Sequence, residues 1–284
     1  MIETTPGALD RLRQIGAYAL DMDGTTYLGG RLLPGAGAFV GLMLAQGIPF
    51  TFLTNNSSKS RAEYGRKLTA LGLPCGEERV MTSGEATIRY LLRERPGQRV
   101  YLAATPSFEA EVREAGIVLA DGRADADLAV LGYDTTLTFE RLVTLCDLVR
   151  DGKALVATHP DVNCPVEGGY WPDVGAFLAL IERSTGRGAD LVVGKPGPLM
   201  VTALCERMGL PAADIAYVGD RLYTDVAMAR RSGMLAVLVL SGETTRADLD
   251  GTPEPPDLVV GGLDELAGLV SAARKAGGAT GSAS

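Results

Sequence analysis

AYALDMDGTT, residues 17–26, is a short apolar run that ends abruptly at two carboxylates and a glycine. A continuous apolar run is typical of a buried parallel strand, and open α/β sheets bind ligands beyond the carboxyl ends of such strands. In an extended chain Asp21 and Asp23 leave the same face, because side chains alternate. Such a pair can hold a hard cation, or one carboxylate can act as a nucleophile. The alternative is an ordinary turn, since Asp-Gly and capping aspartates are common at strand ends.

Three later apolar runs also end in groups suited to phosphate or metal binding. These endings are Thr54, Asn55 and Asn56 after residues 48–53, Lys195 after residues 191–193, and Asp220 with Asp225 after residues 215–218. Because a doubly wound sheet gathers the carboxyl ends of its parallel strands at one edge, we expect the four endings to lie together. Each has a local alternative, such as helix capping by Asn56 or Ser57 or a solvated lysine. Their repetition favours an active site.

The glycine-rich run Pro34-Gly35-Ala36-Gly37 only superficially suggests a dinucleotide-binding loop. No strand leads directly into this run, and Gly41 falls one position late for the third glycine of the GxGxxG pattern. The mismatch argues against a dinucleotide cofactor.

The composition limits the partners of the protein. The chain has 284 residues, a formal charge of −8 and 46% hydrophobic residues, which is typical of a globular protein with a substantial core. The negative charge disfavours nucleic acid and anionic membranes as partners. The first twelve residues lack an apolar signal region, and no apolar run approaches membrane-spanning length, so we expect a cytoplasmic protein.

Histidine and cysteine usage narrows the chemistry. His159 is the only histidine, which excludes a zinc site with several histidines. The four cysteines are widely spaced, without a CxxC pair, and are expected to be reduced and mostly structural. Acid–base and metal chemistry must therefore depend mainly on carboxylates and lysine.

The order of predicted elements indicates a core with an insertion. Residues 83–173 contain their own strands and helices and are predicted to form an inserted α/β domain. Residues 1–82 and 174–276 are predicted to form the two parts of a Rossmann-like α/β core with a doubly wound, mostly parallel sheet. The small, polar tail at residues 277–284 is expected to be disordered. A long polar loop, residues 158–173, returns the chain to the core, and such loops are usually functional or plain connectors.

Taken together, the four endings resemble the four motifs of the haloacid dehalogenase (HAD) superfamily of phosphohydrolases. The sequence Asp21-Met22-Asp23-Gly24-Thr25 matches the DxDGT motif, and the fourth motif, GDxxxTD, matches Gly219-Asp220 with Asp225. The insertion between the second and third motifs, together with the sequences TNN, ATHPD and VGKP, resembles subclass IIA. That p-nitrophenylphosphatase-like group has a large α/β cap and includes nucleotide, sugar phosphate, pyridoxal phosphate and phosphoglycolate phosphatases.

The resemblance implies a Mg²⁺-dependent phosphatase that forms an aspartyl-phosphate intermediate. It assigns Asp21 as nucleophile and Asp23 as general acid and base. The implied Mg²⁺ ligands are Asp21, Asp220 and the backbone carbonyl of Asp23, with Asp225 in support. The implied phosphate-binding residues are Gly24, Thr54, Asn55, Asn56 and Lys195.

The resemblance also implies that the cap selects a small phosphorylated metabolite as substrate and that caps can pair in a homodimer. We hypothesise that the loop from His159 to Asp173 determines substrate specificity, with His159 and Asp161 as the candidate residues, and the alternative is a plain connector. One alternative is a phosphate-ester binding or regulatory protein without catalysis, which retention of both Asp21 and Asp23 disfavours. Another is phosphoryl transfer to an acceptor other than water.

Overall fold

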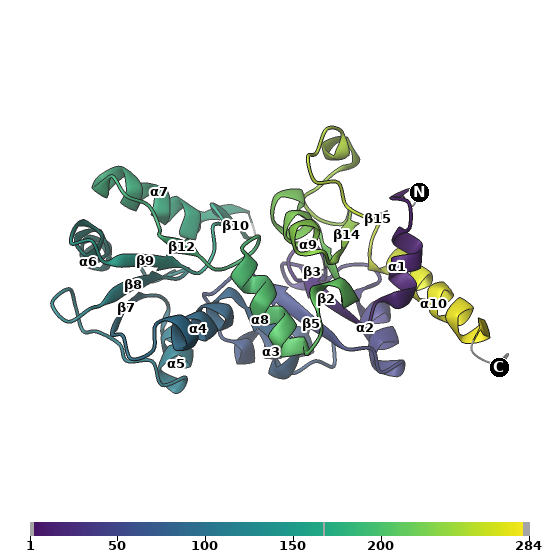
Figure 1. Ribbon diagram of the computed structural model, residues 1–284, viewed down its shortest axis with the longest axis horizontal. Helices are drawn as coiled ribbons and strands as arrows, with labels where there is room; N and C mark the ends of the chain where they lie inside the picture. Colours follow the sequence, from purple (N-terminus) through teal and green to yellow (C-terminus); the bar gives the residue numbers. More distant parts are fainter. Residues whose placement is uncertain (1–2, 167, 281–284) are drawn as a thin grey trace. The chain divides into compact units, whose positions relative to one another are not determined.

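The structure is a computed structural model that describes residues 3–166 and 168–280. Its chain divides into two compact units, each with its own sheet (Figure 1). The first unit consists of Met1–Leu53, Gly65–Val80 and Leu204–Ser284, and the second of Thr54–Tyr64 and Met81–Ala203. The predicted fold class, α/β with a mostly parallel central sheet, is confirmed.

A seven-stranded sheet forms the centre of the first unit. Strand β2 lies between β13 and β5 and pairs parallel with both. Strands β14 and β15 continue the parallel arrangement, and β1 adds an antiparallel edge. In sheet order the strands are β1 (Glu3–Thr4), β15 (Leu258–Val260), β14 (Leu235–Val239), β13 (Ile215–Gly219), β2 (Ala17–Asp21), β5 (Phe50–Thr54) and β6 (Val80–Thr82).

Burial explains why these runs form strands. Every residue of β2, β13 and β14 is buried, as expected for parallel strands that are covered on both faces. Helix α10 packs against both α1 and α2 (Figure 1). The other elements of this unit are α1 (Ala8–Gln14), β3 (Tyr27–Leu28), β4 (Arg31–Leu32), α2 (Ala36–Ala45), η1 (Glu77–Arg79), η2 (Ala212–Asp214), the π-helix η3 (Leu222–Val226), α9 (Ala227–Ser232), η4 (Arg246–Leu249) and α10 (Leu263–Thr280).

The predicted disordered tail overlaps the last helix. Helix α10 ends at Thr280, so residues 277–280 are helical, and residues 281–284 lie outside the described residues.

The second unit contains a four-stranded parallel sheet in the order β12-β9-β8-β7. Its strands are β7 (Val100–Ala103), β8 (Leu128–Leu131), β9 (Ala154–Ala157) and β12 (Leu191–Val192), and its helices are α4 (Ser83–Glu94), α5 (Pro106–Glu114), α6 (Phe139–Arg150) and α7 (Val174–Thr185). Helix α4 begins directly after Thr82, which caps it by accepting a hydrogen bond from the Glu85 N–H.

Two apolar clusters show how helices cover both faces of this sheet. One cluster joins Leu131 and Leu155 to Leu145 of α6 and Ile181 of α7. The other contains Phe108 of α5 and includes Ile88 of α4. Helices α6 and α7 therefore cover one face, and α4 and α5 the other (Figure 1).

The division of the chain differs from the predicted boundaries at residues 83 and 173. Strand β12 was expected in the main sheet, but it pairs with β9 in the smaller sheet, and the second unit continues to Ala203. Both residues of β12 are only half-buried, unlike those of β2 or β13. Helices α3 (Arg61–Ala70) and α8 (Pro198–Met208) each contain residues of both units.

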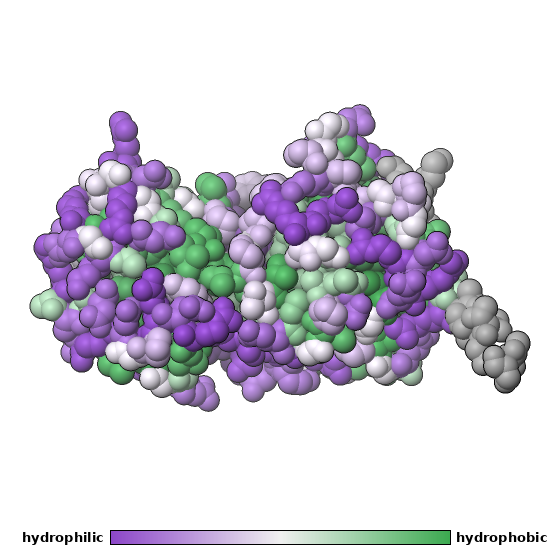
Figure 2. Space-filling view, viewed as in Figure 1, coloured by the Kyte–Doolittle hydropathy of each residue, from purple (hydrophilic) through white to green (hydrophobic). Residues whose placement is uncertain are grey.

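The predicted loop at residues 158–173 contains a hairpin. Strands β10 (Asn163–Val166) and β11 (Gly169–Pro172) pair antiparallel, which the prolines and glycines of this stretch concealed. Hydrophilic side chains cover much of the visible surface, with hydrophobic ones gathered in patches (Figure 2). On the hairpin Tyr170 and Trp171 are 74% and 55% exposed.

Candidate active site

Three buried carboxylates converge at the carboxyl end of the main sheet. Asp21 is the last residue of β2, and Asp220 directly follows the neighbouring parallel strand β13. Asp225 lies in the π-helix that comes next. One carboxylate oxygen of each residue lies within 4.8 Å of the others. All three residues are buried, with Asp21 8%, Asp220 2% and Asp225 1% exposed, so little water is available to screen their charges. The sequence prediction that these strand ends meet is therefore correct for this unit.

Hydrogen bonds orient two of these carboxylates. The Glu243 N–H donates to Asp220 Oδ2 at 2.7 Å, and the Thr25 hydroxyl donates to Asp220 Oδ1 at 3.4 Å. Asp225 accepts from the Tyr217 hydroxyl at 3.3 Å and from the Arg221 N–H at 3.1 Å. Sequence reasoning did not find these donors: two are backbone groups, Tyr217 lies inside a strand, and Thr25 belongs to the DxDGT motif but was given no role.

Two glycines allow backbone to approach Asp220 closely. A Cβ at Gly24 or at Gly242 would overlap the Asp220 carboxylate. Gly24 also has φ +85°, a left-handed conformation that favours glycine. Gly24 is therefore required for the turn after β2, and its role in phosphate binding stays a prediction.

Asp23 differs from the three converging aspartates. Its side chain is partly exposed and accepts a hydrogen bond from the buried Tyr27 hydroxyl at 3.1 Å. A carboxylate held by a neutral donor at the surface of a site suits proton transfer. Tyr27 was not among the predicted site residues.

The donor set fits a hard divalent cation. Three carboxylates that share a buried site repel one another unless a proton or a cation balances their charge. Magnesium prefers carboxylate and carbonyl oxygens and retains several waters. The arrangement of Asp21, Asp220 and Asp225 therefore suits Mg²⁺, with the ligand role of the Asp23 carbonyl left as a prediction.

In the second unit, Asn55 binds the backbone of Lys195. The Asn55 amide accepts from the Lys195 N–H at 2.8 Å and donates to the Lys195 carbonyl at 3.1 Å. It also donates to Asp161 Oδ1 at 3.0 Å. A Cβ at Gly194 would lie 2.6 Å from the Asn55 oxygen, so a glycine is needed there. The structure thus joins three of the predicted residues, but the Asn55 side chain serves Lys195 and Asp161.

Thr54 and Asn56 organise their own loop. The Thr54 hydroxyl accepts from the Asn56 N–H at 3.1 Å, and Asn56 Oδ1 accepts from the Ser58 N–H at 2.9 Å. The cap of α3 is formed instead by Ser60 and Glu63, whose side chains each bond the backbone N–H of the other. Capping of α3 therefore does not explain Asn56, and its phosphate-binding role stays a prediction.

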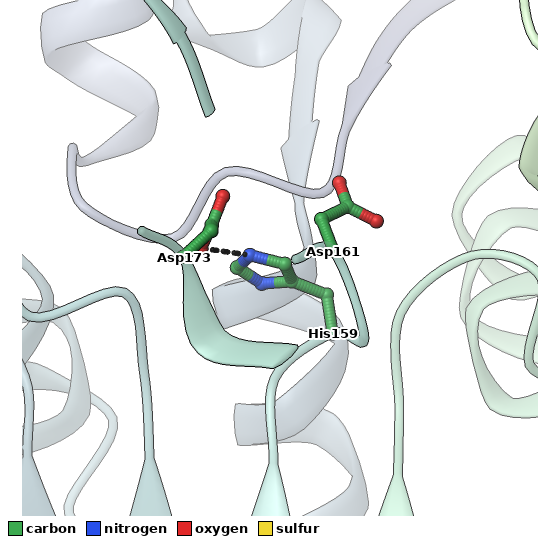
Figure 3. Close-up of side chains that lie close together, drawn as sticks. All are labelled: His159, Asp161 and Asp173. Carbon is green, nitrogen blue, oxygen red and sulfur yellow. Dashed lines mark hydrogen bonds and ion pairs between the residues drawn. The ribbon is translucent and has the colours of Figure 1, made fainter. Parts of the chain in front are cut away.

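His159 lies in a second cluster of three ligand-type side chains, with Asp161 and Asp173 (Figure 3). Its Nε2 contacts Asp173 Oδ1 at 2.8 Å, and its Nδ1 contacts the Thr158 hydroxyl at 2.9 Å. His159 is 0% exposed. Its burial and its two occupied nitrogens do not favour direct contact with a substrate, and the predicted role of His159 in substrate specificity stays a prediction. Asp161 is partly exposed, and its specificity role stays a prediction.

Comparison with known proteins identifies the class of protein. Residues 18–118 match the family described as haloacid dehalogenase-like hydrolase, and residues 192–266 match a HAD-hydrolase-like family. With its α/β fold and its acidic strand ends, the chain belongs to the HAD-like hydrolases, as the four motifs predicted. Within the described residues, no helix combines the length and apolar character needed to cross a membrane.

Individual relatives are phosphatases by name. An acid sugar phosphatase from Staphylococcus aureus is 33% identical over 254 residues, which cover 89% of this chain and 97% of that protein. The crystal structure of a 4-nitrophenylphosphatase from Thermotoga maritima is 44% identical, with a TM-score of 0.87 over 92% of this chain and 99% of that one. NagD from Escherichia coli is 27% identical, with a TM-score of 0.82 over 88% and 98%. The predictions of an enzyme and of the p-nitrophenylphosphatase-like group are confirmed.

Proposed function

We propose that the protein is a Mg²⁺-dependent phosphomonoester hydrolase that acts through an aspartyl-phosphate on Asp21. The observation that carries this proposal is the convergence of Asp21, Asp220 and Asp225 within 4.8 Å at the end of buried parallel strands. A binding protein has no need of a nucleophilic carboxylate with a second carboxylate, Asp23, two residues away.

Two displacements at phosphorus make up the proposed reaction. An Asp21 oxygen attacks phosphorus while the bond to the leaving oxygen breaks, and Asp23 gives that oxygen its proton. Asp23, now a carboxylate, then removes a proton from a water molecule, and the resulting hydroxide attacks phosphorus. The bond to Asp21 breaks, inorganic phosphate leaves, and Asp23 is again protonated. Tyr27 holds the Asp23 carboxylate between these two steps.

The remaining residues would hold the cation and stabilise negative charge on the phosphoryl group. Asp21 and Asp220 would hold Mg²⁺ together with the Asp23 carbonyl, while Asp225 supports this arrangement. When bound, the cation neutralises phosphate charge and the repulsion between the carboxylates. Lys195, the Thr54 hydroxyl and backbone N–H groups near Gly24, Asn55 and Asn56 would stabilise charge on the phosphoryl oxygens.

We infer a small phosphorylated metabolite as substrate, with a sugar phosphate as the first candidate. The support is the identity with an acid sugar phosphatase over most of both chains. The exposed Tyr170 and Trp171 offer flat apolar surface in the hairpin that follows Asp161. A cytoplasmic location and a homodimer paired through the cap belong to this proposal, and cell fractionation and light scattering test them.

The proposal is tested by Mg²⁺-dependent phosphate release from p-nitrophenyl phosphate. The wild type should hydrolyse it, and Asp21→Asn should lower kcat/KM at least about 1,000-fold, because an amide is a poor nucleophile. Asp10→Asn, at an exposed position of α1, is the matched control. Equal activity of the wild type and Asp21→Asn would overturn the mechanism. A wild type that binds phosphate without hydrolysing the ester would support the binding-protein alternative.

A further inference from the structure

A buried chain of hydrogen bonds in the second unit starts at Asp173 and ends in the segment that contains Asn55. We propose that His159 is a positioning residue of the phosphatase: it holds this segment, and through it Lys195, in the geometry that binds phosphate. The expected effect on phosphate binding rests on the proposed function, but the hydrogen-bond chain itself can be tested without catalysis.

For a neutral His159 ring, donor and acceptor chemistry gives the chain one direction. A carboxylate only accepts, so His159 Nε2 carries the proton that bonds Asp173 at 2.8 Å. In the neutral ring Nδ1 then accepts, and the Thr158 hydroxyl donates to it at 2.9 Å. The Ser57 hydroxyl lies 3.0 Å from Thr158 and donates to it, while Ser57 accepts from the Tyr133 N–H at 2.9 Å. Every group along this path has one consistent role.

Two further contacts connect this chain to the phosphate-binding residues. The Ser83 hydroxyl gives its one proton to the Asn55 carbonyl and lies 3.4 Å from His159 Nδ1, so in this tautomer Ser83 packs beside the ring without a hydrogen bond to it. Asp161, two residues after His159, accepts from the Asn55 amide at 3.0 Å. Asn55 in turn bonds both the N–H and the carbonyl of Lys195. The loop at His159 therefore bonds Asn55 through Asp161, and Ser83 of α4 packs between the His159 ring and the Asn55 carbonyl.

Burial argues for positioning and against two other roles of this cluster. His159 is completely buried, and the Tyr133 ring packs edge-on against it with centroids 6.4 Å apart. Asp173 is occupied as well, because it caps α7 by accepting from the Val174 N–H at 2.6 Å. A metal ion at this cluster would have to displace the proton on Nε2 and the bond to Asp173. Direct contact with substrate would require the ring to leave its pocket.

Thr158→Val removes the central hydroxyl of the chain and keeps nearly the same side-chain volume. Thr158→Ser is the matched control, because it retains the hydroxyl. In the valine variant His159 Nδ1 loses its donor, so the 55–58 segment should exchange its amide hydrogens faster. The dissociation constant of inorganic phosphate with Mg²⁺ present should rise about tenfold, the value of one hydrogen bond of ordinary strength. The serine variant should stay within about twofold of the wild type.

The single histidine gives a spectroscopic readout that needs no assignment. In protein prepared without a histidine tag, every imidazole ¹⁵N signal belongs to His159. The wild type should show one tautomer, protonated at Nε2, with an Nδ1 frequency that shifts in Thr158→Val and not in Thr158→Ser. A tautomer protonated at Nδ1 would overturn the proposed direction of the chain.

A second pair of variants separates the two sides of the ring. His159→Asn places its amide near the former Nδ1 and keeps the contact to Thr158, whereas His159→Gln reaches the former Nε2 and keeps the contact to Asp173. Phosphate affinity should fall about threefold or less in the asparagine variant and about tenfold in the glutamine variant. Equal losses would overturn the proposal, as would a Thr158→Val variant with wild-type exchange and phosphate affinity. If the wild type neither binds phosphate nor hydrolyses esters, the proposed function fails, and the exchange data still decide whether His159 positions the segment.

Discussion

The two units each contain a cluster of three side chains that could hold a metal ion, and the clusters are built in opposite ways. In the first, Asp21, Asp220 and Asp225 bring together three acidic groups. In the second, His159 supplies a proton for Asp173, so donor and acceptor satisfy each other. The first cluster therefore needs a cation or protons to balance its charge, whereas His159 and Asp173 of the second satisfy each other without one.

In the first cluster, replacing Asp220 should have the largest effect after replacement of the nucleophile Asp21. Asp220→Asn should lower kcat/KM for p-nitrophenyl phosphate roughly 100-fold and should weaken Mg²⁺ binding. In the wild type, Mg²⁺ should raise the midpoint of thermal unfolding, since a ligand that binds only the folded state stabilises it. Asp220→Asn should show a smaller rise, measured by calorimetry, and the exposed Asp214→Asn should behave as wild type. An undiminished rise in Asp220→Asn would assign the cation elsewhere.

Crowding the same carboxylate should have an intermediate effect. Gly242→Ala places a Cβ against Asp220 and should force the carboxylate to move, with an expected tenfold rise in the Mg²⁺ concentration for half-maximal activity, which is about 1.4 kcal/mol. Gly30→Ala is the matched control, because a Cβ there meets nothing within 4 Å. If both alanine variants need the same Mg²⁺ concentration as the wild type, Asp220 does not require its observed position.

The rate of thiol alkylation should differ between a buried cysteine of the first unit and a half-buried cysteine of the second, and for the buried one it should depend strongly on pH. Burial raises the pKa of Cys75, in the first unit, to about 11. Because the thiolate is the reactive form and is scarce far below that pKa, alkylation by iodoacetamide should be slow at pH 8 and rise roughly tenfold per pH unit. Half-buried Cys164 of the hairpin is the internal comparison and should be labelled first. Mass spectrometry of each cysteine measures both rates, and a Cys75 rate independent of pH would contradict the expectation.

Metal removal should leave the second cluster unchanged. We expect EDTA to abolish ester hydrolysis while the His159 imidazole resonances keep their frequencies. A shift on adding the chelator, reversed by adding Mg²⁺ or Zn²⁺ back, would show that the second cluster also binds metal and would remove the contrast between the units.

The sequence was sufficient for features that depend on a local pattern and a general rule of topology. The apolar run before Asp21 predicts β2, and the parallel arrangement of α/β sheets predicts that Asp220 lies nearby. The apolar stripe and end signals of residues 83–94 predict α4. These elements are fixed by burial periodicity, which the amino-acid order records directly.

Other features depend on partners that are distant in sequence. Strand β12 has the composition of a core strand, and only its pairing with β9 assigns it to the smaller sheet. The position of Asn55 after β5 predicts a phosphate-binding residue. In the structure its side-chain amide bonds the backbone of Lys195, which is 140 residues away. No local pattern records such a partner, and the burial of His159 was missed for the same reason.

The Glu243 N–H that bonds Asp220 at 2.7 Å has a consequence for how this site can vary. The contribution comes from the peptide group and is separate from the Glu243 side chain, which accepts from the Tyr223 hydroxyl at 2.9 Å and pairs with Arg221 at 2.9 Å. The neighbouring Gly242 is restricted for a different reason, because any Cβ there meets Asp220. A substitution scan at position 243 would report only the side-chain contacts to Tyr223 and Arg221, because every substitution keeps the peptide N–H that orients Asp220, proline excepted. A backbone ester at this position, which replaces the N–H by oxygen, would reveal the contribution.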